Sequence, residues 1–449
     1  MRTPTSRLPL LLLAALIAAL ALAPSPASAA GTRDVMYVGN NWDGTADIVD
    51  PVAYKRLARL NIIPDIEQRM AEIMRNPVDY GYFLGIREFV GEGNDQFVDD
   101  MFSSPDGRFL YVSRPSLRDV VAFDLTTRKI VWRVQVDGNR SDHMAISPDG
   151  SRLLVSASTA RKVHVIDTRA GKIVANFPSG DQPHENNYSA DGNLIFHASI
   201  GAVFTPTDDP QFDGTKGERF FQVVDGRTYK VLKRVNIGQK LAEFGKPGMS
   251  AAVRPMAISP DEKWFYFQVS FFHGFVEYSL EQDRITRMVE LPISEDARKK
   301  RRDEYLLDSA HHGLNMNPEG TKLCVAGTMS DYGAIVDRVS FRHTIASQGT
   351  KPYWSTNAGD GKHCFISYSG DDAVSVVSYE TEKEVARIPV GNHPQRMRMG
   401  RILEEALGTA PAPGPPARPA QGKEALRVST RPRRFDVRRP FRVRVRVTT

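Results

Sequence analysis

Residues 141–180, SDHMAISPDGSRLLVSASTARKVHVIDTRAGKIVANFPSG, are one complete copy of a unit that recurs along most of this 449-residue chain. A short apolar run at 144–146 leads into Pro148-Asp149-Gly150, where proline fixes φ and glycine supplies a positive φ. Three β-branched runs follow, and turns containing Gly or Asp separate them. Short β-branched segments between such turns predict a unit of four antiparallel strands.

The turn in this unit recurs along the chain. SPDG stands at 104–107 and 147–150, and degenerate forms stand at 189–192, 259–262, 317–320 and 359–361. Consecutive regular copies lie about forty residues apart, which is the period of a four-stranded propeller blade. The repeat therefore predicts an all-β fold.

The two ends of the repeat array complete each other. The chain begins in the middle of a unit, because 35–40, 46–51 and 55–62 have the character of second, third and fourth strands. The missing first strand, 393–400, lies at the far end. We therefore predict a seven-bladed β-propeller over residues 33–402, with a few short helical insertions, in which the C-terminal strand completes the N-terminal blade.

Three segments carry a family resemblance. SPDGRFLYVS, SPDGSRLLVSAS and the pattern VxVIDTxxGKxVA resemble the YVTN family of β-propeller repeats. This family belongs to a wider group that includes lactonase-like propellers and the nitrous oxide reductase propeller. The resemblance covers roughly residues 34–401 and implies the fold; activity does not follow, because the architecture hosts enzymes, electron-transfer partners and binding scaffolds.

Long insertions predict which end of the ring binds a ligand. Those at 64–98, 238–253 and 294–310 join a fourth strand to the next first strand, and 201–217 joins a second to a third strand. We expect a helix at 66–75 and a charged helix in EDARKKRRDEYLL. In an antiparallel blade both kinds of connection emerge at one end, so we predict that end as the binding face.

Histidines gather at the same end. Five of the ten directly precede first strands: His143, His184, His311, His312 and His393. Neutral imidazoles that converge on a channel mouth suit Cu or Zn, so we assign a metal set of His143, His184, His312 and His393. The arrangement resembles the nitrous oxide reductase propeller only in outline, since that family has more histidines and a separate copper domain. The alternative is hydrogen bonding to the neighbouring blade.

Other polar residues at this end form a predicted ligand rim of Asp100, Glu185, Arg254 and Tyr353. Acidic and aromatic groups around one mouth suit a sugar, a cationic peptide or a small organic molecule. The alternative for the acids is a structural role, because Asp in turns accepts backbone hydrogen bonds. No catalytic residue is assigned, because no local nucleophile, nucleotide-binding or zinc-protease motif occurs.

The two cysteines, Cys324 and Cys364, exclude a C-x-x-C-H attachment site for haem c. They are offset by one position on equivalent second strands of neighbouring blades. Their side chains therefore point either toward each other or directly apart. The first case permits a disulfide in an oxidising compartment, and the second leaves two buried thiols.

Both termini lie outside the repeats. Residues 1–29 have the pattern of a signal peptide cleaved near Ala29, with a retained anchor as the alternative. A Pro/Ala-rich linker at 403–422 precedes a basic tail at 423–449. The tail contains ten Lys/Arg and two acidic residues, whereas the formal net charge of the whole chain is +6. We expect the tail to be either an incomplete β segment or a polycationic segment that binds anionic envelope polymers. Because the rest of the chain is nearly neutral, we expect no specific binding of nucleic acid. We expect no membrane-spanning segment after signal cleavage.

These features predict a secreted propeller that serves as a binding module or scaffold. Its partner would be a small molecule, glycan or protein at the loop-rich face. The alternative is a secreted propeller enzyme, either a metal-dependent oxidoreductase with Cu or Zn at the histidines or a lactonase-like hydrolase. Convergence of the histidines across the channel is the observation that bears most on this choice.

Overall fold

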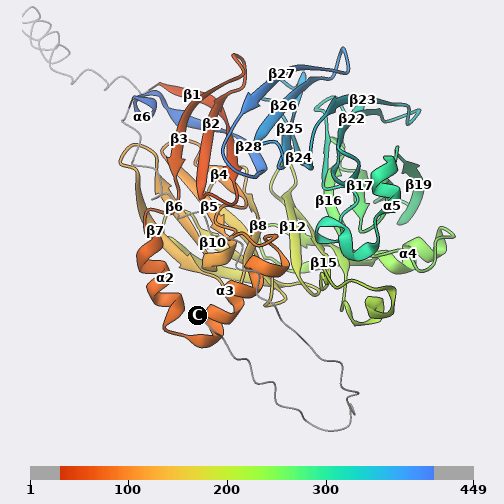
Figure 1. The fold of residues 1–449 in the computed structure, drawn as a ribbon, viewed down its shortest axis with the longest axis horizontal. Helices are drawn as coiled ribbons and strands as arrows, with labels where there is room; N and C mark the ends of the chain where they lie inside the picture. The colour runs from red at the N-terminus through yellow and green to blue at the C-terminus, as the bar shows by residue number, and fades with distance from the viewer. Residues whose placement is uncertain (1–30, 409–449) are drawn as a thin grey trace, which may run out of the picture. The chain divides into compact units, whose positions relative to one another are not determined.

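A computed structural model of the chain describes residues 31–408, which form a ring of seven four-stranded antiparallel sheets around a central channel (Figure 1). In each blade the first strand is innermost. Neighbouring first strands contact one another around the whole ring. The predicted seven-bladed β-propeller is confirmed.

The blades have these strands. Blade one consists of β28 (Pro394–Leu403), β1 (Thr32–Asn40), β2 (Thr45–Asp50) and β3 (Lys55–Asn61). Blade two consists of β4 (Met101–Ser103), β5 (Phe109–Arg114), β6 (Asp119–Asp124) and β7 (Lys129–Gln135). Blade three consists of β8 (Ser141–Ile146), β9 (Arg152–Ala157), β10 (Lys162–Asp167) and β11 (Lys172–Pro178).

The remaining four blades follow in chain order. Blade four consists of β12 (Pro183–Tyr188), β13 (Leu194–Ser199), β14 (Phe220–Asp225) and β15 (Val231–Asn236). Blade five consists of β16 (Val253–Ile258), β17 (Trp264–Val269), β18 (Gly274–Ser279) and β19 (Arg284–Glu290). Blade six consists of β20 (Gly313–Met316), β21 (Lys322–Gly327), β22 (Tyr332–Asp337) and β23 (His343–Gln348). Blade seven consists of β24 (Pro352–Asn357), β25 (His363–Tyr368), β26 (Ala373–Ser378) and β27 (Lys383–Pro389).

Strand β28 closes the ring as the sequence predicts. It pairs antiparallel with β1, so that Leu403 lies opposite Thr32 and Met399 lies opposite Met36. Figure 1 shows the blue end of the chain inside the red blade. The pairing removes the free edges that an open array would expose.

The repeated turn has a specific local cause. The Ser147 hydroxyl donates to Asp149 and accepts the backbone N–H of Arg152, while Gly150 adopts a φ of 73°. A Cβ at Gly150 would lie 2.4 Å from Pro105 of the preceding blade. The glycine therefore serves both the turn and the close approach of two blades.

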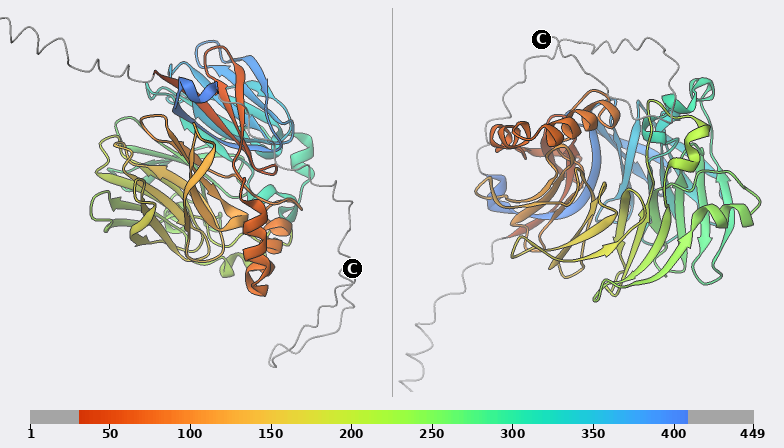
Figure 2. Two further views of the ribbon diagram at one scale, coloured as in Figure 1. Left: turned by 90° about the vertical axis from the view of Figure 1, so that its left-hand side faces the viewer. Right: turned by 90° about the horizontal axis from the view of Figure 1, so that it is seen from below.

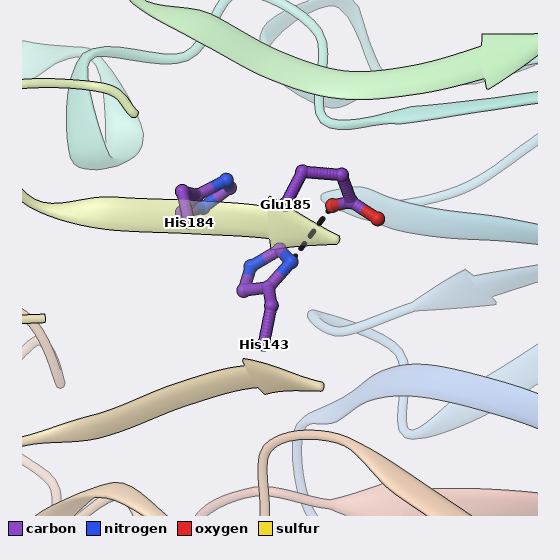
Figure 3. A group of neighbouring side chains, drawn as sticks. All are labelled: His143, His184 and Glu185. Carbon is purple, nitrogen blue, oxygen red and sulfur yellow. Dashed lines mark hydrogen bonds and ion pairs between the residues drawn. The ribbon is translucent and has the colours of Figure 1, made fainter. Parts of the chain in front are cut away.

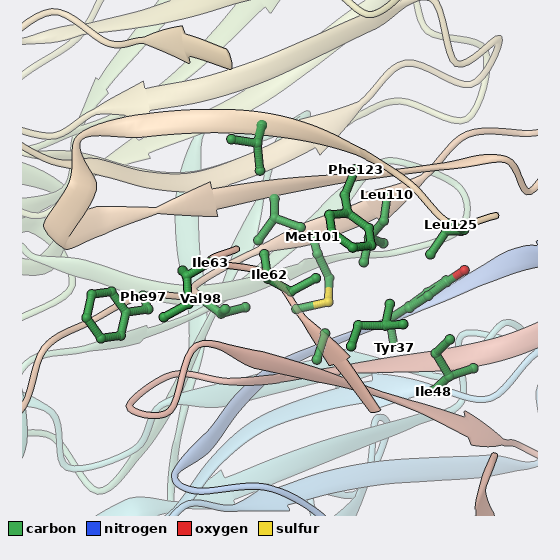
Figure 4. Close-up of a cluster of buried hydrophobic side chains, with 14 of the residues drawn as sticks. Tyr37, Ile48, Ile62, Ile63, Phe97, Val98, Met101, Leu110, Phe123 and Leu125 are labelled. Atoms are coloured by element: carbon green, nitrogen blue, oxygen red, sulfur yellow. The ribbon is translucent and has the colours of Figure 1, made fainter. Parts of the chain in front are cut away.

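Apolar side chains from neighbouring blades form the core. Figure 4 shows the cluster between blades one and two, where Tyr37 and Ile48 face Met101, Leu110 and Phe123. Second and third strands are almost entirely buried, whereas fourth strands such as β11 are largely exposed. Burial on both faces explains why the inner strands are continuous apolar runs in the sequence.

The insertions contain the helices, and Figure 2 shows α2 and α3 side by side at one edge of the ring. The helices are α2 (Ile66–Met74), α3 (Pro77–Phe89), α4 (Ile237–Glu243), α5 (Glu295–Lys299) and α6 (Glu404–Leu407). The 3-10 turns are η1 (Pro115–Leu117), η2 (Pro210–Thr215), η3 (Arg302–Glu304), η4 (Leu306–Asp308) and η5 (Thr328–Ser330). Within residues 31–408 no helix combines the length and the apolarity that crossing a bilayer requires.

Of the two helices that the sequence predicts, one is present and the other is not. The helix expected at 66–75 is confirmed as α2. The single helix expected in EDARKKRRDEYLL is wrong: α5 ends at Lys299, and two 3-10 turns follow. Of this stretch only Ala297 and Leu306 are buried, so there is no apolar face along which a longer helix could pack.

Cys324 on β21 and Cys364 on β25 form a disulfide between blades six and seven. Of the two orientations that the sequence allowed, the side chains therefore point toward each other. The predicted signal peptide, the tail and the linker from 409 onward lie outside the described residues. Residues 404–407, within the predicted linker, form α6, which packs through Ala406 on blades one and two.

Candidate functional site

β-Bulges shape the insertion-bearing end of the channel. In β8, β12, β16, β24 and β28 one extra residue stands opposite the neighbouring strand near the start of the first strand. A bulge bends the strand and changes where its side chains point, and bulges are frequent next to binding sites. The same irregularity thus aims polar residues of successive blades at the channel.

Strand register sorts these residues into two rings. The outer ring holds Asp99, Asp142, His184, Arg254, His312, Tyr353 and Gln395. One position further along the strands, the inner ring holds Asp100, His143, Glu185, Pro255, Gly313, Trp354 and Arg396. Every residue of the outer ring lines one cavity of about 40 Å³, and Arg396 of the inner ring joins them.

Three insertions cover this cavity. Its remaining walls include Val90 after α3, Val203 in the loop 201–217 and Leu307 in the loop 294–310. Leu307 has a φ of 48° and Asp308 a φ of 62°, which only strong local contacts hold in place for residues other than glycine. Asp308 supplies them, because it accepts from Thr205 Oγ1 at 2.6 Å and from Lys216 Nζ at 3.1 Å. The mouth is therefore a capped cavity with a polar floor and an apolar roof.

The histidines converge in part. Figure 3 shows His143 and His184 facing each other beside Glu185, with ring centroids 3.7 Å apart. His143 Nδ1 lies 2.7 Å from Glu185 Oε2, and His184 lies 5.9 Å from the ring of His312. One donor atom each from His143, His184 and Glu185 lie within 4.8 Å of one another.

The cluster contains buried polar atoms without partners. Asp99 Oδ2, His143 Nε2, His184 Nδ1 and His312 Nδ1 make no hydrogen bond to any part of the chain between residues 31 and 408. Buried polar side chains in proteins are nearly always hydrogen-bonded. Their concentration around one cavity marks this place as different from the rest of the core.

Burial keeps the three imidazoles neutral. It lowers the pKa of His143, His184 and His312 well below the ordinary value, and the nearby Arg396 guanidinium adds to the effect. Neutral imidazole offers one N–H donor and one acceptor nitrogen. Each ring can therefore donate to an anion or coordinate a cation.

Burial acts in the opposite direction on two carboxyl groups. It raises the pKa of Asp99 to about 7 against the opposing charge of Arg396. It raises the pKa of Glu185 to about 8, although Arg398 and Arg396 oppose the shift. Near neutral pH these two groups carry or release a proton readily, which is a property of many ligand and catalytic sites.

Most charges at the mouth are paired, two of the pairs across blades and one within the start of blade three. Arg396 pairs with Asp99, and Arg398 holds Asp100 through two bonds of 2.8 and 2.9 Å. Arg140 lies 2.5 Å from Asp142. Arg254 differs from all of these, because its Nε and Nη2 donate only to the hydroxyl of Ser270.

The predicted site residues are not all brought together. His143, His184 and His312 form the cluster, but His393 does not join it: the ring stacks on Trp42 at 3.7 Å and lies outside the cavity lining. β28 begins at Pro394, so His393 precedes both rings. His311 also lies apart, beside His273 and Tyr332. Of the predicted rim, Arg254 and Tyr353 line the cavity, whereas Asp100 and Glu185 lie in the inner ring.

Sequence reasoning missed Arg396 and Arg398. Both stand in the closing strand, where Arg alternates with Met in QRMRM. The sequence did offer a sign of their role, because two arginines in a strand that is buried by ring closure must find polar partners inside the ring. Arg396 contacts Trp354 with its guanidinium carbon 5.0 Å from the ring centroid, so the closing strand supplies part of the cavity floor.

Comparisons with known proteins assign the chain to no family. No protein-family model matches the chain, and no curated protein matches its sequence. Among solved structures, Kuenenia stuttgartiensis hydrazine synthase is similar with a TM-score of 0.49 and 16% identity, over 66% of this chain and 88% of that chain. Likeness at this level carries no information about ligand or activity.

Proposed function

We propose that the protein is an exported β-propeller of the YVTN type that binds a small polar ligand inside the capped mouth of its channel. The propeller architecture itself supports a binding or scaffold role. The repeat SPDG supports the family, and the pattern of residues 1–29 supports export. The basic tail, 423–449, would hold the exported protein near anionic envelope polymers.

One observation carries the ligand-binding part of this proposal. Unpartnered atoms of Asp99, His184 and His312 are fully buried and belong to side chains that line the same cavity. A cavity of about 40 Å³ has room for roughly two or three water molecules or for one small solute. The competing occupant is water alone, and a binding experiment separates the two.

Thermal unfolding of the untagged mature chain tests the proposal. The probes are ZnCl₂, CuCl₂, sodium formate, sodium acetate, sodium nitrate and glucose, each added at constant ionic strength. A probe that binds should raise Tm by about 3–5 °C at a hundredfold excess over its Kd. Val203→Trp, which fills the cavity from the cap, should abolish the shift.

Val339→Trp is the matched control, because Val339 is 81% exposed in a turn between third and fourth strands. It should leave the shift unchanged. The proposal fails if no probe raises Tm, or if Val203→Trp responds as the wild type does. Intact mass of the protein recovered from the medium tests export, since cleavage near Ala29 predicts the loss of the first 29 residues.

A transition-metal ion is a second candidate ligand, and the donor set of His143, His184 and Glu185 favours it. Imidazole nitrogen and carboxylate oxygen suit Zn²⁺ and Cu²⁺. Metal content of untagged protein should then be close to one ion per chain and should fall in the His184→Ala/His312→Ala double variant. Equal metal content in both proteins, or none in either, contradicts this candidate.

A further inference from the structure

Arginine pairing around the mouth leaves one positive charge without a carboxylate. The charged residues that line the cavity are Asp99, Arg140, Asp142, Arg254 and Arg396. Asp99 is matched by Arg396 and Asp142 by Arg140. No carboxylate between residues 31 and 408 lies within 4.0 Å of the Arg254 guanidinium, so the lining has a formal excess of +1.

Arg254 is almost completely buried, with 1% of its surface exposed. Burial even lowers its pKa. The charges of Asp308 and Asp142 oppose this shift from a distance, since neither carboxylate forms an ion pair with Arg254. A guanidinium stays protonated in proteins, and a buried charge without a directly paired carboxylate is strongly unfavourable. A side chain in this state is suited to an anion that enters from outside the chain.

The geometry of Arg254 leaves a defined edge for that anion. Ser270 Oγ accepts from Nε at 3.1 Å and from Nη2 at 3.0 Å, which fixes one side of the guanidinium plane. These are the side-chain hydrogen bonds of Arg254 within residues 31–408, and Nη1 takes part in neither. The fork formed by Nη1 and Nη2 matches the two oxygens of a carboxylate or nitrate.

Neutral polar side chains lie next to Arg254 in the cavity lining. Arg254 stands between His184 and His312 in the outer ring, and both imidazoles have an unpartnered Nδ1. Tyr353 follows next and packs on His312 with ring centroids 4.1 Å apart. The apolar roof of Val203 and Leu307 keeps this group away from bulk water, which strengthens attraction between opposite charges.

We propose that the ligand of the mouth is a small planar oxyanion with a single negative charge, such as a short carboxylate or nitrate, held by Arg254. This inference rests on the proposed ligand-binding function and specifies the class of ligand. The cavity volume of about 40 Å³ excludes large ligands. While Asp99 is ionised, the formal charges of the lining sum to +1, which a monovalent anion balances and a divalent anion exceeds.

Calorimetric titration of the full mature chain tests the inference. Sodium formate, acetate and nitrate are the planar monovalent probes, and sodium sulfate is the divalent tetrahedral comparison. At constant ionic strength and neutral pH, at least one planar probe should bind about 100-fold more tightly than sulfate. Arg254→Gln should weaken that probe by about 100-fold, and Arg254→Lys should recover part of the affinity because it restores the charge without the fork.

Arg227→Gln is the matched control, since Arg227 is exposed in a turn between β14 and β15. It should bind the probe as the wild type does. If Arg254→Gln does not fold, Ser270→Ala takes its place: loss of the hydroxyl frees the guanidinium plane and should weaken binding by about tenfold.

The outcomes separate this inference from the function on which it rests. Binding of a planar anion that disappears in Arg254→Gln supports both. Binding of Zn²⁺ or glucose that Val203→Trp abolishes, without binding of any anion, keeps the proposed function and overturns the anion. Anion binding that survives Arg254→Gln also overturns the inference, and failure of every probe overturns both.

Discussion

Two buried arginines of this propeller, Arg114 and Arg254, have opposite surroundings. Arg114 is wholly enclosed and binds Asp65 at 2.6 and 3.0 Å and Asp119 at 2.7 and 2.9 Å. Arg69 joins the same network through Asp119 at 3.1 Å. Arg254 is equally buried, yet its only partner among the described residues is the hydroxyl of Ser270. Two arginines with the same burial thus differ in whether a carboxylate pairs with them, and we propose that this difference separates a structural arginine from a ligand-binding one.

The largest expected effect concerns Arg114. Arg114→Met should lower the free energy of unfolding by about 3–5 kcal/mol, because it leaves Asp65 and Asp119 without their principal counter-charge. Urea unfolding followed by circular dichroism measures the change. Arg56→Met is the control, since Arg56 is 44% exposed and 3.9 Å from Asp47, and it should change stability by less than about 1 kcal/mol. A loss below 1 kcal/mol for Arg114→Met would remove the distinction between the two arginines.

Acid should affect the mouth end through its buried histidines. Burial lowers the pKa of His393 to about 3, against an ordinary value of 6.5. A depressed histidine pKa gives stability that is complete above pH 6.5 and is lost as the pH falls toward 3. On going from pH 7 to pH 5, the free energy of unfolding should therefore fall by about 2 kcal/mol less in His393→Gln than in the wild type.

Urea midpoints of the two proteins at these two pH values measure the difference. His343→Gln serves as control, because His343 is exposed at the start of β23 and should leave the pH dependence as in the wild type. Identical pH dependence in His393→Gln and the wild type would contradict a neutral, buried imidazole at position 393.

The smallest effect is expected at Arg254 itself. Arg254→Met removes a buried charge that has no carboxylate partner, so stability should stay within about 1 kcal/mol of the wild type or rise. The same urea experiment checks this in buffer without added anions. A loss of 3 kcal/mol or more would place Arg254 in the same structural class as Arg114, and the comparison would fail.

Much of the ring could be read from the sequence, and the reason is physical. The turn at 147–150 needs a positive φ at Gly150 and close contact with Pro105, so similar residues recur at this turn in most blades. Ring closure by the C-terminal strand could be predicted because the N-terminal part of the chain supplies only three strands of blade one. The helix α3 escaped prediction because Gly81 and Gly85 lower helix propensity, although Asn76 caps it and Pro77 begins it.

The site was less accessible to sequence reasoning. Position before a first strand selected His184 and His312, which line the cavity, but it also selected His393, which lies outside both rings. The bulges decide which residue enters the cavity, and a pattern of strands and turns does not reveal them. Ion pairs at the mouth could not be predicted from the sequence either, because Asp99 and Arg396 are 297 positions apart.

Ring closure by β28 has a consequence for the order in which the molecule matures. Arg396 and Arg398 lie on this last strand and neutralise Asp99 and Asp100 of blade two. A chain emerging from the ribosome or from a translocation pore acquires these arginines only after all other blades have been made. Long-range pairing of this kind is slow to form. The cavity lining is therefore complete only after β28 has joined β1, and a chain that ends before residue 394 lacks Arg396 and Arg398.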